Sequence, residues 1–241
     1  MNNLVLSIFP GIDLLGKAFE EIGFCVVRGP DLLWGGDIRT FHPPAGVFGG
    51  VIGGPPCQMF SQLRYLNLLA SQKHGNMIPE FERVVSEAKP QWFLMENVPA
   101  APVPEVIGYK VHSIVYNNRW AGGVQQRERR FSFGTPEGQK LLPEEVIFET
   151  TEESLAVLAG HGPTPGKRRA VTMLASSGGA LHPGNFNRPP LPIMCELQGL
   201  PSAFCDDMPF TTVGKRQVIG NGVPLPMGRA IAKAVRKAIS P

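Results

Sequence analysis

The side chain best suited to covalent chemistry in this sequence is Cys57, in the segment GGPPCQ at residues 53–58. The segment directly follows an apolar run at 47–52 that is typical of a strand. A thiol held in a Gly/Pro turn at the end of a strand is exposed to substrate and can act as a nucleophile. The alternative is a small buried hydrophobic residue, which is the usual fate of a free cysteine. Cys57 is therefore a candidate nucleophile.

A carboxylate lies at the end of a second apolar run, in the segment WFLMENVP at 92–99. Glu96 and Asn97 follow this run and are expected at the same edge of the sheet as Cys57. Because burial raises the pKa of a carboxyl group, a carboxylate in this position can donate a proton near neutral pH. The alternative is a carboxylate that simply pairs with an arginine.

An arginine-rich segment, QQRERR at 125–130, opens a further predicted strand. Alternation along a strand would place Gln125, Arg127 and Arg129 on one face. Amide and guanidinium groups in such a row bind anions and carbonyl oxygens. The alternative is a solvated run of charges.

These residues need a scaffold, and the hydrophobic pattern predicts alternating strands and helices. The apolar run at 4–9, the turn FPGID at 9–13 and the helical spacing from Leu14 onward predict strand, tight turn and helix, and the run at 24–27 completes a βαβ unit. The other predicted strands are 47–52, 92–95, 109–115 and 130–133, and the other predicted helices are 63–71, 79–88 and 224–238. This order indicates a doubly wound, mostly parallel α/β sheet.

The composition supports one folded domain with a small insert and excludes several other classes. The 241 residues are 43% hydrophobic and 18% charged, which is enough for a substantial core. No apolar run reaches the length of a membrane span and the N-terminus lacks a secretory signal, so we expect a cytoplasmic protein. The four cysteines contain no Cys-x-x-Cys pair, so neither a metal site nor a disulfide framework is indicated. The formal charge of +3 permits a polyanionic partner without requiring one.

The turn after the first predicted strand is a candidate nucleotide site, because α/β sheets bind such ligands outside the carboxyl ends of their strands. Phe9 offers a ring face to an adenine, and Asp31 and Asp37 offer acceptors for ribose hydroxyls and a base amino group. The alternatives are a tight turn that uses Gly11 for steric reasons and isolated surface aspartates. The fingerprint Gly-x-Gly-x-x-Gly is absent after this strand, which argues against a nicotinamide-dependent oxidoreductase.

Taken in order, the motifs of the chain resemble those of the DNA (cytosine-5) methyltransferases. The matching segments are FPG at 9–11, GDI at 36–38, PPCQ at 55–58, ENVP at 96–99, QQRER at 125–129, LQGLP at 197–201 and GNGVP at 220–224. They run from the first predicted strand to the last predicted helix, and the compact layout is similar to that of phage or prophage members, which points to the cytoplasm of a bacterial or phage-infected cell. The resemblance implies the Rossmann-like fold of S-adenosylmethionine-dependent methyltransferases with a small irregular target-recognition insert.

The resemblance also implies a mechanism in which Cys57 adds to C6 of a cytosine, making C5 able to accept a methyl group from S-adenosylmethionine. Glu96 would neutralise charge at N3, with Asn97 shaping the turn, and Arg129 with Arg127 would hold the cytosine O2 and brace the site. The target base must leave the duplex, and the loop 58–76 is the expected closing segment.

The remaining site residues are assigned in the same way. The cofactor, whose product is S-adenosylhomocysteine, is expected to contact Phe9, Pro10, Gly11, Ile12, Asp31, Asp37, Ile38, Pro56, Asn221 and Val223. The expected DNA contacts are Gln58, Ser61, Gln125, Lys167, Arg168 and Arg169.

The resemblance divides the chain into a catalytic and cofactor-binding domain at 1–134, a target-recognition segment at 135–187 and a return to the catalytic domain at 188–241. The short recognition segment suggests a target of a few base pairs in double-stranded DNA, or help from a protein partner; the enzyme itself is expected to be a monomer. Ser7 stands where the family usually has Asp, and Asp13 and Leu14 stand where it usually has glycines.

Two alternatives share this framework. One is an RNA (tRNA) cytosine-5 methyltransferase, which the short recognition segment leaves open. The other is a catalytically silent DNA-binding relative, which would be expected to have lost Cys57 or Glu96; both are present.

Overall fold

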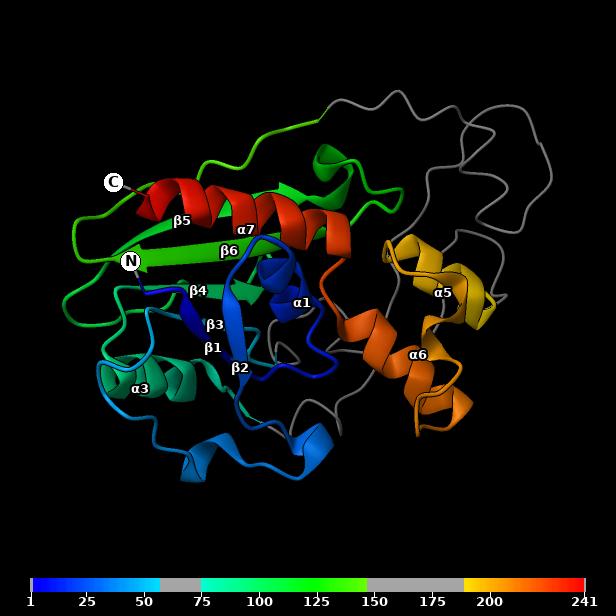
Figure 1. Cartoon of the computed structure of the whole chain (residues 1–241), viewed down its shortest axis with the longest axis horizontal. Coiled ribbons are helices and arrows are strands. Elements are labelled where there is room, and N and C mark those ends of the chain that lie inside the picture. Colours follow the sequence, from blue (N-terminus) through cyan, green and yellow to red (C-terminus); the bar gives the residue numbers. More distant parts are fainter. Residues whose placement is uncertain (1, 57–74, 147–188, 241) are drawn as a thin grey trace. The chain divides into compact units, whose positions relative to one another are not determined.

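The computed structural model describes residues 2–56, 75–146 and 189–240 (Figure 1). Its centre is a six-stranded sheet in the order β2-β1-β3-β4-β6-β5. The strands are β1 (Leu4–Ile8), β2 (Cys25–Arg28), β3 (Gly50–Gly53), β4 (Trp92–Asn97), β5 (Lys110–Asn117) and β6 (Glu128–Thr135). The helices are α1 (Leu14–Glu21), α3 (Ile78–Ala88), α5 (Leu191–Leu197), α6 (Thr212–Asn221) and α7 (Leu225–Ile239). Short 3-10 turns are η1 (Leu32–Trp34), η2 (Ile38–Thr40), η4 (Asn118–Ala121) and η5 (Ser202–Cys205).

The sheet brings the predicted site segments to one edge. Strands β2, β1, β3 and β4 are parallel, and in the register Ile8 lies opposite Gly53, which lies opposite Met95. Because parallel strands have their carboxyl ends at the same edge, the segments that follow β1, β3 and β4 begin side by side. Strand β6 runs antiparallel to β4 and therefore starts at that edge, with Arg130 opposite Asn97.

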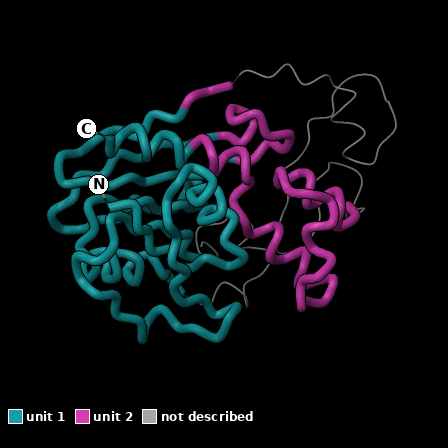
Figure 2. The backbone as a smooth tube through the Cα atoms, in the orientation of Figure 1, with its two compact units in different colours: residues 1–116, 128–143, 231–241 teal, residues 117–127, 144–230 magenta. Residues whose placement is uncertain are grey.

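The chain forms two compact units (Figure 2). Unit 1 contains residues 1–116, 128–143 and the chain from Ile231 on, and unit 2 contains residues 117–127 and 144–230. The segment 189–230, predicted as part of a return to the catalytic domain, is thus counted with unit 2. Most of the predicted recognition segment 135–187 lies outside the described residues, and its role stays a prediction.

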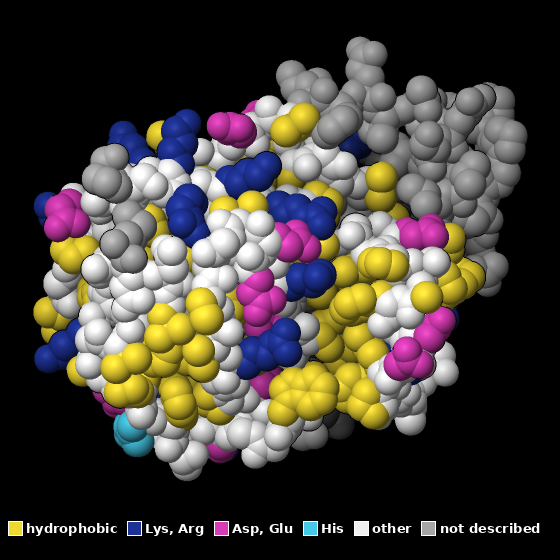
Figure 3. Space-filling view, viewed as in Figure 1, with side chains coloured by type: hydrophobic (Ala, Val, Ile, Leu, Met, Phe, Trp, Pro, Cys, Tyr) yellow, Lys and Arg dark blue, Asp and Glu magenta, His cyan; other side chains and the backbone are white. Residues whose placement is uncertain are grey.

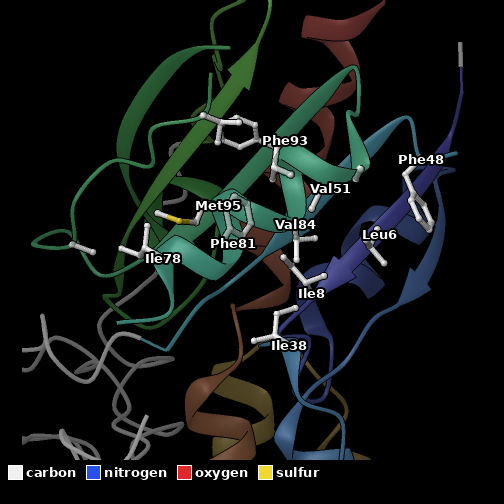
Figure 4. Packing of buried hydrophobic residues seen from close by; sticks show 14 residues of the cluster. Leu6, Ile8, Ile38, Phe48, Val51, Ile78, Phe81, Val84, Phe93 and Met95 are labelled. Atoms are coloured by element: carbon white, nitrogen blue, oxygen red, sulfur yellow. The ribbon is translucent and has the colours of Figure 1, made fainter. Parts of the chain in front are cut away.

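The core of unit 1 lies on both faces of the sheet. On one face, Phe81 and Val84 of α3 pack in a cluster with Leu6, Ile8 and Phe93 (Figure 4). Since side chains alternate along a strand, the neighbours of Phe93 point the other way. On that opposite face the Trp92 ring stacks on Phe19 of α1, with ring centroids 6.0 Å apart. Helices therefore cover both faces, which explains why the central strands are apolar along their whole length.

The observed elements confirm most of the predicted ones. The six predicted strands are present with shifted ends, and the helices predicted at 79–88 and 224–238 are α3 and α7. Two predictions were wrong. Strand β6 begins at Glu128, so Gln125 and Arg127 precede it and share no strand face with Arg129. The segment 216–224, which the sequence alone leads us to expect as a turn before the last helix, is largely the end of α6, which continues to Asn221. The helix predicted at 63–71 lies outside the described residues.

Two further properties concern the described ranges only. No helix in them is long and apolar enough to cross a bilayer. They also contain no group of three or more His, Cys, Asp or Glu side chains arranged to hold a metal ion.

Candidate active site

Glu96 and Arg129 form an ion pair within unit 1. Glu96 is near the end of β4, and Arg129 is near the start of its antiparallel neighbour β6. The Arg129 Nε lies 2.9 Å from Glu96 Oε1, and the two side chains retain 17% and 12% exposure. The arginine pairing that the sequence offered as an alternative is therefore present. It also joins two residues that the resemblance assigns to the same cytosine.

The turn that precedes Cys57 is fastened to the end of β4. The Asn97 side-chain amide donates to the carbonyl of Pro55 at 3.2 Å, and Asn97 itself is almost completely buried. A Cβ at Gly54 would lie 3.0 Å from Glu96 Oε2, so glycine permits a close approach of this backbone to the carboxylate. Pro56, one of the predicted cofactor contacts, is half-buried and is the last described residue before Cys57.

Cys57 itself lies outside the described residues, but the other cysteines bear on its candidacy. Cys195 and Cys205 are buried in unit 2 with their Sγ atoms 3.2 Å apart, whereas Cys25 is exposed on the edge strand β2. Burial raises the pKa of the Cys195 thiol to about 12, so this thiol stays protonated and unreactive. Neither buried cysteine competes with Cys57 as a nucleophile.

The turn after β1 has an unusual backbone. Phe9, Gly11 and Asp13 all have positive φ, at 53°, 56° and 56°. Such angles are rare for a bulky residue such as Phe9 and persist where surrounding contacts enforce them, often at binding sites. A Cβ at Gly11 would meet no atom within 4 Å, so there is open space beside this turn.

Asp13 provides the contacts that enforce this turn. Its buried carboxylate accepts from the Ser7 hydroxyl at 2.8 Å, from the Gly16 amide at 3.1 Å and from Arg28 Nε at 3.0 Å. It therefore caps the N-terminus of α1. Ser7 and Asp13, two of the residues at which the chain differs from the family pattern, are thus hydrogen-bonded to each other. The carboxylate is in the turn and not on the strand, and the strand carries the hydroxyl that donates to it.

Asp31 and Trp34 hold the same turn from the segment after β2. One Asp31 oxygen accepts from the Gly11 amide at 2.8 Å, and the other accepts from the Leu33 amide at 2.8 Å. The Trp34 indole N–H donates to the Gly11 carbonyl at 2.7 Å while the ring stays 56% exposed. Both side chains are therefore placed next to the open space beside Gly11. The sequence motifs do not include Trp34, although a tryptophan just before GDI could have indicated a further residue of this site.

The GDI segment leads into the 3-10 turn η2, which begins at Ile38. Asp37 caps it by accepting from the Arg39 amide, and it pairs with the Arg39 guanidinium with Nη2 2.6 Å from Oδ2. Hydrogen bonds from Arg39 lower the pKa of Asp37 to about 2, so this carboxylate remains ionised at any ordinary pH. Ile38 is buried in the cluster that contains Ile8 (Figure 4). Phe9 packs against the same cluster, so the two predicted adenine contacts border one apolar surface.

Gln125 and Gln198 form a buried pair in unit 2, which we call the glutamine hub. The Gln125 side-chain amide donates to the Leu197 carbonyl at 2.8 Å and to Gln198 Oε1 at 2.9 Å. The Gln198 amide donates to the carbonyls of Ile219 at 2.5 Å and Gly222 at 3.1 Å. Both glutamines are fully buried. Gln125 thus donates two hydrogen bonds inside unit 2, and its predicted contact with DNA stays a prediction.

The glutamine hub holds the segment that contains Asn221 and Val223, two predicted cofactor contacts. Asn221 is exposed at the end of α6, whereas Val223 is buried. Arg127 is also buried in unit 2, with Nη2 3.4 Å from the Asn221 carbonyl. Arg127 therefore braces this turn, and its predicted contact with cytosine O2 stays a prediction.

The remaining predicted DNA contacts, Gln58, Ser61 and Lys167–Arg169, lie outside the described residues. Among the described basic residues, Arg28, Lys233 and Lys237 are exposed. Figure 3 shows Lys and Arg side chains gathered on the face of the molecule where α1 and α7 lie in Figure 1.

A sequence profile of the C-5 cytosine-specific DNA methylases matches residues 35–161 of the chain, which is more than half of its length. The chain belongs to this family. The segment matched includes the GDI turn, Cys57, Glu96 and Arg129. The expected family is therefore confirmed, and both partners of the Glu96–Arg129 ion pair lie within the matched segment.

Two relatives and one solved structure show the extent of the likeness. The Type II methyltransferase M.MthTI of Methanothermobacter thermautotrophicus is 31% identical over 171 residues, covering 58% of this chain and 51% of that protein. The Type II methyltransferase M1.HphI of Haemophilus parahaemolyticus is 32% identical over 130 residues, covering 47% of this chain and 34% of that protein. The chain thus spans about half of the length of M.MthTI and about a third of that of M1.HphI. The Entamoeba histolytica methyltransferase EhMeth has a TM-score of 0.66 at 12% identity with both chains fully covered, which confirms the α/β methyltransferase fold.

Proposed function

We propose that the chain is a DNA (cytosine-5) methyltransferase that forms a covalent Cys57–C6 adduct with a flipped-out cytosine. The observation that carries this proposal is the Glu96–Arg129 pair beside the Gly54–Pro55 backbone, in a chain of the C-5 cytosine-specific DNA methylase family. A carboxylate and a guanidinium held together at the edge of the sheet suit a ring that must gain a proton at N3 and be held at O2. The nucleophile follows Pro56 directly in the chain.

The residues of the chain divide the chemistry between them. The Cys57 thiolate attacks C6, which makes the C5–C6 bond a single bond and leaves an enamine across C4 and C5 whose C5 is nucleophilic. Glu96 supplies the proton that neutralises N3, and Arg129 holds both Glu96 and the ring oxygen. Once C5 carries the methyl group, its proton passes to solvent, the Cys57 sulfur leaves C6 as the thiolate, and the N3 proton returns to Glu96.

The residues after β1 and β2 fit S-adenosylmethionine. Open space lies beside Gly11, and Phe9 and Ile38 border one apolar surface suited to an adenine. Asp31 and the ionised Asp37 provide acceptors for ribose hydroxyls and an adenine amino group. When bound, S-adenosylmethionine supplies an electrophilic methyl group on a sulfonium. The residues in unit 1 that would hold it are Phe9, Pro10, Gly11, Ile12, Asp31, Asp37, Ile38 and Pro56, and the cofactor contacts expected of Asn221 and Val223 stay predictions.

We propose double-stranded DNA as the substrate and a bacterial or phage-infected cytoplasm as the location. The names of M.MthTI and M1.HphI as Type II methyltransferases support this substrate. Binding should weaken with salt, because phosphate contacts release counterions.

The test is transfer of labelled methyl groups from S-adenosylmethionine to double-stranded DNA, followed by bisulfite sequencing. C57A should abolish transfer, and E96Q should lower kcat by about 10²-fold or more through loss of the acid. C25A is the matched control, because Cys25 is exposed and pairs with Leu4 at the end of the parallel strands opposite to the site segments, so its activity should equal that of the unchanged protein. Transfer by C57A would refute the covalent mechanism, and transfer only to tRNA would move the protein to the RNA branch.

A further inference from the structure

Arg83 on α3 binds the backbone of the segment 37–41, which we call the adenine segment. Its Nη2 donates to the Ile38 carbonyl at 2.8 Å, and its Nη1 donates to the Phe41 carbonyl at 3.1 Å. These carbonyls lie at the two ends of η2, so one side chain fixes the whole turn. Arg83 is distant in sequence, with 45 residues separating it from Ile38.

The adenine segment is held from a second side by apolar packing. The Ile38 side chain is buried in the same cluster as Phe81 and Val84 of α3. The apolar face of α3 and the side chain of Ile38 therefore belong to one buried cluster, and Arg83 of the same helix binds the Ile38 carbonyl. Rotation or withdrawal of η2 would break both sets of contacts.

Two glutamates fix the guanidinium in place. Arg83 Nε lies 2.8 Å from Glu80 Oε2, and Nη1 lies 2.8 Å from Glu87 Oε1. His42 Nδ1 also lies 3.0 Å from Glu87 Oε2. Partial burial lowers the pKa of Arg83, but the hydrogen bonds that it donates to Glu87 and Glu80 raise the pKa overall, so the guanidinium is always charged.

We propose that Arg83 is a positioning residue for the cofactor: it fixes Asp37 and Ile38 in the conformation that receives an adenine ring. The inference rests on the proposed function, because the adenine belongs to S-adenosylmethionine. Arg83 does not touch the reacting atoms, so it acts on cofactor affinity and not on the chemical step. A planar guanidinium is required, since it can reach two carbonyls and two carboxylates at once, which the single ammonium of lysine cannot.

The experiment compares R83K and R83Q with E82Q. Glu82 lies on the same helix and accepts from the Glu105 amide at 2.7 Å, so E82Q disturbs a different loop and serves as the matched control. For each variant we would measure the Kd of S-adenosylhomocysteine by titration calorimetry, KM and kcat for methyl transfer, and the thermal midpoint.

Both Arg83 variants should weaken S-adenosylhomocysteine binding and raise KM for S-adenosylmethionine by about tenfold, the effect of losing charge-assisted hydrogen bonds. Their kcat should stay within about twofold of the unchanged protein, because uniform binding is lost without loss of the chemical step. E82Q should change neither constant.

Two results would overturn the inference. If R83K and R83Q bound S-adenosylhomocysteine as tightly as E82Q does, the bonds from Arg83 to the adenine segment would not determine the affinity for the cofactor. A fall in both kcat and the thermal midpoint, with KM unchanged, would show that Arg83 contributes to stability alone. If the unchanged protein binds no S-adenosylhomocysteine and transfers no methyl group, the proposed function fails first, and that outcome is separately visible.

Discussion

The adenine segment of unit 1 and the turn at 219–223 of unit 2 are held by opposite means. Arg83 holds the first with a charge that is only partly buried, at 26% side-chain exposure. The glutamine hub holds the second with neutral amides that are fully buried. Both segments contain residues that we propose as cofactor contacts. The chain therefore uses a charged surface clamp on one and an uncharged internal clamp on the other.

The difference has energetic consequences. An exposed ion pair is screened by salt and contributes little to stability, since water solvates its partners when it breaks. A buried amide that loses its hydrogen-bond partner cannot bind water instead, so breaking the bond lowers the free energy of unfolding strongly. The hub should dominate stability, and the Arg83 clamp should mainly affect the local conformation of its segment.

The largest effect is expected from Q198E. The substitution keeps the acceptor for Gln125 but replaces the donor to the carbonyls of Ile219 and Gly222 with a carboxylate oxygen. Burying that charge against two carbonyls should destabilise the fold by about 3 kcal/mol. Urea unfolding measures it, with Q217E on the exposed side of α6 as control. Equal midpoints for the two variants would remove the distinction between the two clamps.

An intermediate effect is expected at Asp13, which combines features of both clamps: a buried carboxylate with an exposed arginine partner. D13A removes a helix cap and leaves the Ser7 hydroxyl and the Gly16 amide without their partner, so it should destabilise by about 2 kcal/mol. R28A, which removes only the partner with 61% exposure, should destabilise by less than about 1 kcal/mol. If R28A lowered the free energy of unfolding in urea as much as D13A does, the exposed charge of Arg28 would be the main stabiliser of the turn.

The smallest effect is expected from E87Q, and it should depend on pH. Hydrogen bonding from Arg83 lowers the pKa of Glu87 below its ordinary value of 4.5. A lowered carboxyl pKa gives stability that is fully present above the unfolded pKa and is lost as pH falls through the folded one. The difference between the unchanged protein and E87Q should therefore be largest near pH 7 and disappear on acidification below pH 4.5. A difference that grows in acid would contradict the pairing.

The sequence predicts elements whose pattern is strong and local. The apolar runs that became β1, β3 and β4 were visible because strands covered on both faces are apolar throughout. Helix α6 was missed because its segment, TVGKRQVIGN, has two glycines and few apolar residues. Such a helix is stabilised by tertiary contacts that no local pattern reveals.

The residues of the site likewise divide into those that a local sequence pattern predicts and those that depend on tertiary contacts. Glu96 could be predicted because it ends a strand, and its pairing with an arginine was one of the two alternatives derived from the sequence. The glutamine hub could not be predicted, since Gln125 and Gln198 are 73 residues apart and each looks like an ordinary polar residue in a loop. The same holds for Arg83, which the helical pattern places only on the polar face of α3.

The three tryptophans give this protein a set of internal optical reporters. Trp92 is 1% exposed between Phe19, Phe24 and Phe133, so its emission should be blue-shifted and protected from iodide quenching until unit 1 unfolds. Trp120 in unit 2 is 41% exposed and should be quenched throughout. Trp34, bonded to the Gly11 carbonyl, stands where a change in its own fluorescence would report occupancy of the turn without any added label.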